Sequence, residues 1–421
     1  MDLTSPVASA EEPVRRWWTP TPASRMSVPL LTALFAVALA GRFSLDRVGL
    51  PTYGVPDLRV PGCILLLLGT IVWYVKRWAH GIRPSWPPPM VLLFTALIGV
   101  QLVSALWSPP GARLGKVAWD LLALLILVLA AAVLSAGDPA RAARVLLVLM
   151  LGAAIVYTVG ALLASPDGQG RYSAFGGGPN VFVRVVCLGI IAAVTLARIR
   201  GGWLLLLPLP LLASGAVLSG SRGGLVSLVA AGVAFVVLFP GRVRVAYLIA
   251  VVALVTLSAW AVSILPDGAS QEMAGDRYSV SGVQQGGFSS RPMLLARAWS
   301  LFADHPVSGA GLDSYHALSG LTYPHNYLLG LAAESGVVAV ALFLAAAVRF
   351  WRDGRPWSAA PREQVGCAIA AIYIAVASNF SGDYYDTRFF WILAVVALLR
   401  PPTEAGPESS PVPDPFVRTC S

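Results

Sequence analysis

The sequence predicts an all-α protein that crosses a membrane many times. Hydrophobic residues make up 57% of the chain and charged residues only 12%, which is about half the charged share typical of soluble domains. Runs of roughly twenty apolar residues recur along the chain, and a helix needs this length to cross the hydrocarbon core of a bilayer. Backbone polar groups must be paired inside lipid, and the alternating pattern of strands is absent, so the spans are expected to be helices.

About twelve transmembrane helices are expected, and they form a helical domain over residues 26–400. The predicted spans are 27–42, 60–75, 88–107, 117–135, 142–164, 180–197, 202–218, 223–239, 244–264, 325–348, 365–380 and 388–400. Residues 1–25 and 401–421 are rich in Pro, Ser and acidic residues, a composition typical of disordered tails. Between the ninth and tenth spans, residues 265–324 form one large polar loop.

The distribution of Lys and Arg predicts the orientation. With the N-terminus inside, basic pairs such as Arg198/Arg200 and Arg242/Arg244 fall in short inner loops, and the inner face carries the excess of positive charge, as the positive-inside rule requires. Both tails are therefore expected in the cytoplasm, and residues 265–324 outside the inner or plasma membrane. The net charge of +9 then reflects topology, and no nucleic-acid partner is expected. The four cysteines show no spacing typical of a disulfide framework or a zinc site.

The outer loops contain the segments with unusual chemistry, and Ser219–Gly224 is the first of these. This Ser-Gly-Ser-Arg-Gly-Gly turn opens the eighth span from the outer side. The free N–H groups of a helix N-terminus attract anions, and the Arg222 guanidinium beside Ser221 suits phosphate. An interfacial arginine in a tight turn would show the same pattern, so phosphate binding and a simple turn both remain open.

A second outer segment, residues 168–180, contains Arg171 and ends in Gly-Gly-Pro-Asn180 before the sixth span. Arg184 lies about one turn inside that span, where a cation is costly unless it is paired or faces water. Asp120, just inside the fourth span, is the candidate partner, and a structural ion pair is the favoured role of the two residues.

The large loop is expected to contain at least one amphipathic helix, from Ser289 to Asp304. A serine cap, a proline in the first turn and Pro306 after the end are typical helix signals. Apolar residues recur at helical spacing, which predicts that the helix lies on the membrane surface or on the bundle. Arg291 is at its N-terminal end and free to reach a ligand.

His325 follows Pro324 and opens a long apolar helix at the outer boundary of the membrane. A helix N-terminus disfavours imidazolium, so His325 is expected to be neutral and available as a base. Asn326 follows it. Glu334 lies deeper in the same helix, where a carboxylate must be protonated, paired or in a polar cavity; Arg184 is a conceivable partner.

Together these segments resemble the O-antigen ligase and polymerase superfamily with its Wzy-type C-terminal domain, which comprises bacterial membrane glycosyltransferases acting on polyprenyl-diphosphate-linked glycans. The resemblance covers roughly residues 170–350. Its matching pieces are Gly177–Asn180, Ser219–Gly224, the stretch from Arg291 through Asp304-His305-Pro306 to Gly311, and His325-Asn326 through Glu334-Ser-Gly336.

The resemblance implies that Arg222 and Arg291 hold the donor diphosphate and that His325 activates the acceptor hydroxyl. Transfer would be inverting, without a nucleotide sugar, a cofactor or a metal. This agrees with the residues themselves, because a diphosphate leaving group needs its charge stabilised and a hydroxyl needs a base near neutral pH. The outer loops show no paired carboxylates with metal spacing except Asp383 and Asp386 in the segment 381–388, and an alternative role for these two is to position an acceptor. Expected supporting residues are Ser221, Arg171, Asn180, Arg184, Asn326, Glu334 and Asp383.

These motifs do not identify the acceptor, which could be a glycan, a lipid or a protein. A ligase, a polymerase and a protein glycosyltransferase are therefore all compatible with the sequence. A transporter or flippase of a glycolipid or small solute is the alternative from a different class. Such proteins concentrate polar residues near the bilayer midplane, where only Asp120, Arg184 and Glu334 are candidates here. A catalytically silent assembly scaffold is a third reading.

Overall fold

The structure, a computed structural model, describes residues 27–41, 43, 45, 57–79, 88–239 and 291–400. These residues form α-helices and short 3-10 helices, and no strand is present among them. The all-α prediction is confirmed. The α-helices are α2 (Ser27–Ala40), α3 (Arg59–Ala79), α4 (Pro89–Val103), α5 (Leu114–Ser135), α6 (Pro139–Leu163), α7 (Pro179–Arg200), α8 (Leu209–Leu218), α9 (Arg222–Leu238), α13 (Arg291–Asp304), α14 (Ser314–Ser319), α15 (Tyr327–Asp353), α16 (Arg362–Ser378) and α17 (Arg388–Leu398).

Six of the described helices are long and apolar enough to cross a membrane, and the protein is a multi-pass membrane protein. They are α3, α4 with the 3-10 turn that extends it to Trp107, α5, α6, α7 and α15. The apolar helices α2, α8 and α9 are shorter, so the number of about twelve spans stays a prediction. The span predicted at 244–264, loop residues 265–290 and the tails 1–25 and 401–421 lie outside the described residues.

Local sequence signals explain where several helices begin and end. Proline occupies the first helical position of α4, α6 and α7, where its missing N–H would be unpaired in any case. The Asp138 carboxylate accepts a hydrogen bond from the Arg141 backbone N–H at 3.0 Å and caps α6. Gly201, with φ +66°, ends α7 in the left-handed conformation that glycine adopts without steric cost.

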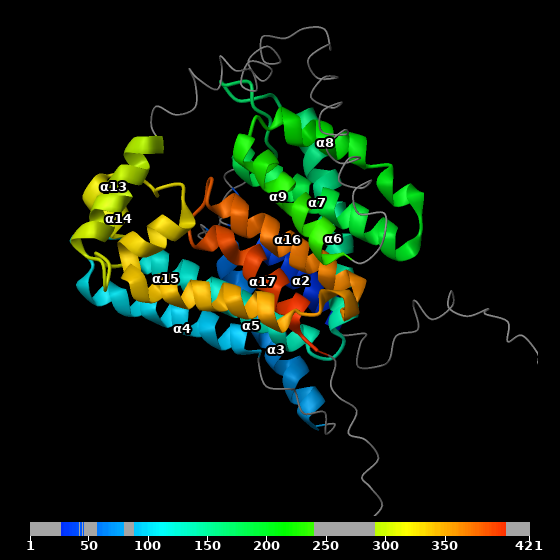
Figure 1. Cartoon of the computed structure of the whole chain (residues 1–421), viewed down its shortest axis with the longest axis horizontal. Coiled ribbons are helices and arrows are strands. Elements are labelled where there is room, and N and C mark those ends of the chain that lie inside the picture. Colours follow the sequence, from blue (N-terminus) through cyan, green and yellow to red (C-terminus); the bar gives the residue numbers. More distant parts are fainter. Residues whose placement is uncertain are drawn as a thin grey trace, which may run out of the picture.

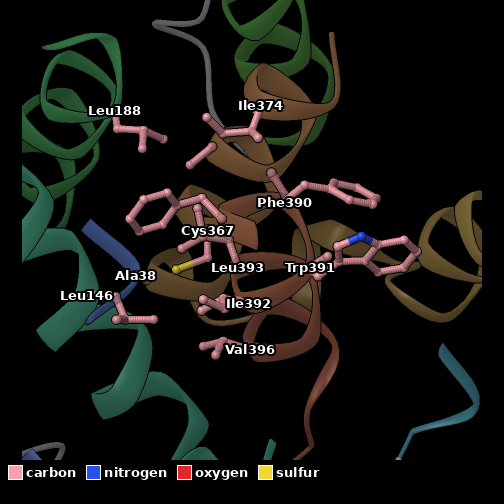
Figure 2. Packing of buried hydrophobic residues seen from close by; sticks show 14 of the residues in the cluster. Ala38, Leu146, Leu188, Cys367, Ile374, Phe390, Trp391, Ile392, Leu393 and Val396 are labelled. Carbon is pink, nitrogen blue, oxygen red and sulfur yellow. The ribbon is translucent and has the colours of Figure 1, made fainter. Parts of the chain in front are cut away.

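The centre of the bundle is α17, with α16 beside it. Every residue of α17 is buried, and a helix that is apolar on all sides belongs in the interior. The ring centroid of Trp391, in the first half of α17, lies 4.7 Å from that of Phe94 and 4.7 Å from that of Phe390. Figure 1 shows α16 and α17 between the helices α6 to α9 on one side and α4 with α15 on the other, and Figure 2 shows the apolar side chains that fill this centre.

The loops at one end of the bundle contact one another, and we call this end the site end. The Arg113 guanidinium forms an ion pair with Asp313 at 2.9 Å. The Asn180 amide donates a hydrogen bond to the Ser381 hydroxyl, and this hydroxyl contacts the His325 ring. These contacts, with the hydrogen bond from Ser221 at the start of α9 to Asn180, place the starts of α5, α7, α9, α15 and α17 at the same end. The ends of α3 and α5 and the starts of α2 and α6 surround one cavity at the opposite end.

Helix α15 is interrupted at Gly336, and the segment 305–311 fills the interruption. Gly336 has φ +68° and ψ −171°, a region open essentially to glycine alone. The Val337 N–H donates to the Pro306 carbonyl at 2.8 Å, and the Ala310 and Gly311 N–H groups donate to the carbonyls of Ala333 and Glu334 at 2.9 and 3.1 Å. The backbone groups released by the break are therefore paired inside the protein, as a membrane span requires.

Substituting Gly336 with Ala is expected to destabilise the fold by at least about 2 kcal/mol, because it combines backbone strain with overpacking. A Cβ at this position would collide with the Val307 carbonyl. Thermal unfolding in detergent measures the loss. Gly152→Ala is the matched control, since this glycine lies within helix α6 with open space around it; equal unfolding midpoints for the two variants would contradict the proposed tight fit.

The helix predicted from Ser289 to Asp304 is present as α13, although residues 289 and 290 lie outside the described residues. Leu294, Ala298 and Leu301 are buried in a small cluster with Tyr315 and Ala333, so α13 packs against α14 and α15 (Figure 1). Leu295 and Trp299 stay exposed. Because α13 rests on α15, the residue at its start, Arg291, is held over the site end.

Candidate active site

Two polar cavities open at the site end. We call the first the arginine cavity, because Arg184 and Arg291 both line it. Asn180, Ser221 and Ser381 complete its polar lining, and Gly223 and Gly224 form part of its wall. We call the second the carboxylate cavity. It is lined by Asp120, Asp313, Glu334 and Asp383, with Arg113, Lys116, Gln101, Tyr323, Asn326 and Tyr384.

Arg184 brings a nearly buried positive charge to the arginine cavity. Its guanidinium lies 3.5 Å from the Asp386 carboxylate and donates to the Ala377 carbonyl at 3.4 Å, while only 8% of the residue is exposed. Arg291 enters the same cavity from the start of α13 and is exposed. Two guanidiniums from distant parts of the chain therefore converge on one small space.

The start of α9 forms another wall of the arginine cavity. Ser221 is the N-cap residue of α9, and Gly223 and Gly224 lie in the first turn. A Cβ on Gly223 would crowd Phe380, and one on Gly224 would crowd Val183, so the two glycines allow close packing as well as access to the backbone. The half-buried Arg222 is in the same turn, but its side chain is not part of the cavity lining.

Asn180 is the centre of a hydrogen-bond network beside the arginine cavity. Its Oδ1 atom accepts from Arg171 Nη2 at 3.2 Å and from the Ser221 hydroxyl at 2.9 Å, and its Nδ2 donates to Ser381 Oγ at 2.9 Å. Arg171 also donates from Nε to the Ser219 carbonyl at 3.0 Å. Because arginine can only donate, the amide oxygen must face Arg171, and the orientation of the Asn180 amide is thereby fixed.

His325 lies next to lining residues of both cavities, although its own ring lines neither. Its Nδ1 atom is 3.4 Å from Ser381 Oγ, in the arginine cavity, while its neighbours Pro324 and Asn326 line the carboxylate cavity. The His325 backbone has φ +58°, an uncommon conformation for a residue with a side chain and one that is often found at functional sites. Tyr323 lies beside it, with ring centroids 4.4 Å apart.

The surroundings of His325 favour its neutral form. Partial burial lowers its pKa below the ordinary value of 6.5, the positive charges of Arg291 and Arg184 lower it further, and Asp386 opposes them. Below the histidine, Asn326 caps α15 by accepting from the Leu329 N–H at 2.9 Å and donates to the Asn379 carbonyl at 3.2 Å. The start of α15 is thus tied to the end of α16.

The predicted ion pair between Asp120 and Arg184 is wrong. Asp120 instead pairs with Arg59 at 2.6 Å, and both side chains are buried, because α3 and α5 begin side by side. Arg184 instead faces Asp386 at 3.5 Å. Arg184 is also not the partner of Glu334, whose carboxylate is bonded by the backbone N–H groups of Asp313 and Tyr315.

Asp383 lines the carboxylate cavity while holding the shape of its own loop. Its carboxylate accepts from the backbone N–H groups of Tyr385 and Asp386 at 3.0 and 3.2 Å. The Tyr385 ring lies between two guanidiniums, Arg59 at 4.4 Å and Arg388 at 4.9 Å from its centroid. These contacts fix the segment 381–388 against α3 and α17.

Little in the sequence indicates the role of Ser381, which connects Asn180 to His325. It stood out only as the first residue of an outer segment with clustered charges, and a lone serine carries no motif of its own. Among the described residues, no group of three His, Cys, Asp or Glu side chains is placed to hold a metal ion.

Comparison with known proteins bears on part of this site. Residues 207–344 match the family described as O-Antigen ligase (Wzy_C), and no curated protein or solved structure matches the chain. The matched stretch contains Arg222, Arg291 and His325, whereas Asn180, Arg184 and Ser381 lie outside it. Residues 207–344 therefore carry an O-antigen ligase family domain, which confirms the resemblance seen in the sequence.

Proposed function

We propose that this protein transfers a glycan from a polyprenyl diphosphate to an acceptor hydroxyl, with His325 as the base. The observation that carries the proposal is the position of His325 next to lining residues of two polar cavities, one with two arginines and one with several carboxylates. A transferase with two substrates needs its base within reach of both the donor site and the acceptor site. The O-antigen ligase family match supports a lipid-linked glycan as the class of donor.

The arginine cavity is the proposed site of the donor diphosphate. Arg184 and Arg291 supply two forked cations, which suit phosphate oxygens. The start of α9, where backbone N–H groups have no partner within the helix, lines the same space. These donors would stabilise the negative charge that develops on the departing diphosphate. Arg222, in the first turn of α9, is proposed to act at the edge of this site, where the longer donor leaves the cavity.

Ser381 is proposed to set which nitrogen of His325 acts as the base. The hydroxyl of Ser381 has one proton, and Tyr323 is within hydrogen-bond reach of it. If Ser381 donates to Tyr323, its two lone pairs accept from Asn180 Nδ2 and from a proton on His325 Nδ1. The Nε2 atom of His325 is then unprotonated and free to accept the acceptor's proton.

The carboxylate cavity is the proposed acceptor site. Asp383 and Asn326 can bond sugar hydroxyls, and Tyr323 and Tyr384 offer rings against which a sugar can lie. In the transfer step the acceptor oxygen bonds the anomeric carbon, the carbon–oxygen bond to the diphosphate breaks with its electron pair, and the hydroxyl proton passes to His325. Attack from the side opposite the leaving group inverts the anomeric configuration.

The acid limb of the pH–activity profile is expected below about pH 6.5, because the base must be neutral and its pKa lies below the ordinary value. kcat/KM should therefore be level from alkaline pH down to about 6.5 and fall only at lower pH. In Arg291→Gln the loss of a nearby positive charge raises the pKa, so the residual activity should begin to fall at higher pH. An acid limb that begins well above pH 6.5 in the wild-type enzyme would contradict this assignment.

Release of polyprenyl diphosphate tests the proposed function directly. Purified protein is incubated with lipid-linked glycans extracted from the native membrane, and the lipid product and the glycosylated acceptor are followed by mass spectrometry. Transfer predicts that both products appear together. The transporter alternative predicts movement of intact glycolipid across proteoliposomes with neither product, and that result would sink the transfer proposal.

A further inference from the structure

A third cavity lies at the end of the bundle opposite His325, where α2 and α6 begin and where α3 and α5 end. Its floor is apolar: Leu31, Trp73 and Leu134 line it and are each at most 5% exposed. Its polar lining residues Ser27, Arg77 and Arg141 are more exposed than these apolar ones, and they therefore mark its opening. The cavity is therefore amphipathic along its depth, with positive charge at the opening.

Arg77 is held in a fixed position at this opening. Its guanidinium lies over the Trp73 ring, 4.8 Å from the centroid, and a Cβ added to Gly137 would collide with it. The absence of a side chain at Gly137 thus provides the room that Arg77 occupies. Stacking on tryptophan orients a guanidinium and leaves the N–H groups at its edge available.

The charge of the opening is only partly balanced. Asp138 is the one acidic residue of the lining, and one of its oxygens is already bonded to the Arg141 backbone N–H as the cap of α6. Within the described ranges, no ion pair to a carboxylate is found for Arg77 or Arg141. Two guanidiniums against one carboxylate leave a net positive charge.

We propose that this cavity binds the phosphate of an anionic phospholipid headgroup, with Arg77 and Arg141 on the phosphate and the apolar floor against the glycerol and first acyl carbons. Guanidiniums bind phosphate oxygens through paired hydrogen bonds. The distribution of basic residues assigns this end to the cytoplasm, where anionic lipids attract basic side chains next to membrane helices. The site is remote from His325, and it does not depend on the proposed transfer reaction.

The test is the thermal unfolding of the full chain in detergent, titrated with short-chain phosphatidylglycerol or phosphatidylcholine. A ligand that binds only the folded state raises the unfolding midpoint, so phosphatidylglycerol should raise it more than phosphatidylcholine does. In the variant Arg77→Gln/Arg141→Gln, the half-saturating concentration of phosphatidylglycerol should increase by roughly tenfold or more.

Arg352→Gln/Arg355→Gln is the matched control, because it removes the same charge from the end of α15, where Arg355 stacks on Trp351 at 4.7 Å. It should titrate as the wild type does. Gly137→Ala provides a second test that keeps every charge but displaces Arg77, and it should also weaken the phosphatidylglycerol effect. An unchanged half-saturating concentration in the arginine and Gly137 variants would overturn the proposal. So would an equal shift with inorganic phosphate, which would indicate a free-anion site.

Discussion

His325→Ala is expected to lower the rate of glycan transfer by about 10²–10⁴-fold, which is the usual contribution of a general base. The loss should appear in kcat more than in the KM for the lipid-linked donor, because the arginine cavity does not include the imidazole. Single-turnover assays with donor in excess of KM separate the two effects. The fold should persist, since His325 is half-buried and lies before the first residue of α15.

His305→Ala is the matched control for this variant. His305 is exposed at the end of α13, and its ring makes no described hydrogen bond. It should keep wild-type activity. If His325→Ala retained full activity, or if both variants lost activity equally, His325 would not be the base.

The helices were predictable because each depends on a local signal. Proline at the first position of α7 and α6, and asparagine before α15, mark helix starts that the structure places within a few residues of the prediction. Likewise, the residues of α13 show an apolar spacing that is visible without any partner. Hydropathy alone also locates α17, but its complete burial depends on the helices packed around it, among them α5, α6, α15 and α16, and could not be foreseen.

The pairings at the site could not be predicted in the same way. Asn180 and Ser381 are 201 residues apart in the sequence, and Arg184 reaches Asp386 only because α7 and α16 pack together. Several carboxylates and arginines fall at similar depths in their helices, so depth alone does not identify partners. For this reason the partner predicted for Asp120 was wrong: Asp120 pairs with Arg59 and not with Arg184.

Two glycines in the sequence, Gly309 and Gly336, are related to the interruption of α15, but they do not predict it. In the sequence, Gly336 is an ordinary residue of an apolar span and Gly309 an ordinary residue of a loop. In the structure, a side chain on either glycine would collide with the segment that contains the other. The two glycines are compatible with many arrangements, and only their contact in space shows that the segment 305–311 replaces part of the helix's own hydrogen bonding. This contact connects α13, with Arg291, to α15, which begins beside His325.

Arg291→Gln is expected to lower kcat/KM for the lipid-linked donor by roughly 10²–10³-fold, the cost of removing one donor that stabilises a developing negative charge. Arg291 is exposed and at the start of α13, so its replacement should leave the unfolding midpoint unchanged. Arg291→Lys keeps the charge but loses the forked geometry, and it should recover only part of the activity. Donor titration in transfer assays, with unfolding measured on the same samples, checks both statements.

Arg297→Gln separates a role on the donor from a role in holding α13. Arg297 is in the same helix, donates to the Leu318 carbonyl at 3.3 Å and is not part of the arginine cavity. Its loss removes the same charge and a contact between α13 and α14, so activity should stay near that of the wild type. If both glutamine variants lost activity to the same extent, Arg291 would act by placing α13. If only Arg291→Gln lost activity, the guanidiniums of Arg291 and Arg184 would act on the diphosphate itself. Adding Arg184→Gln to Arg291→Gln should then lower the activity little further, because the two arginines work as one unit.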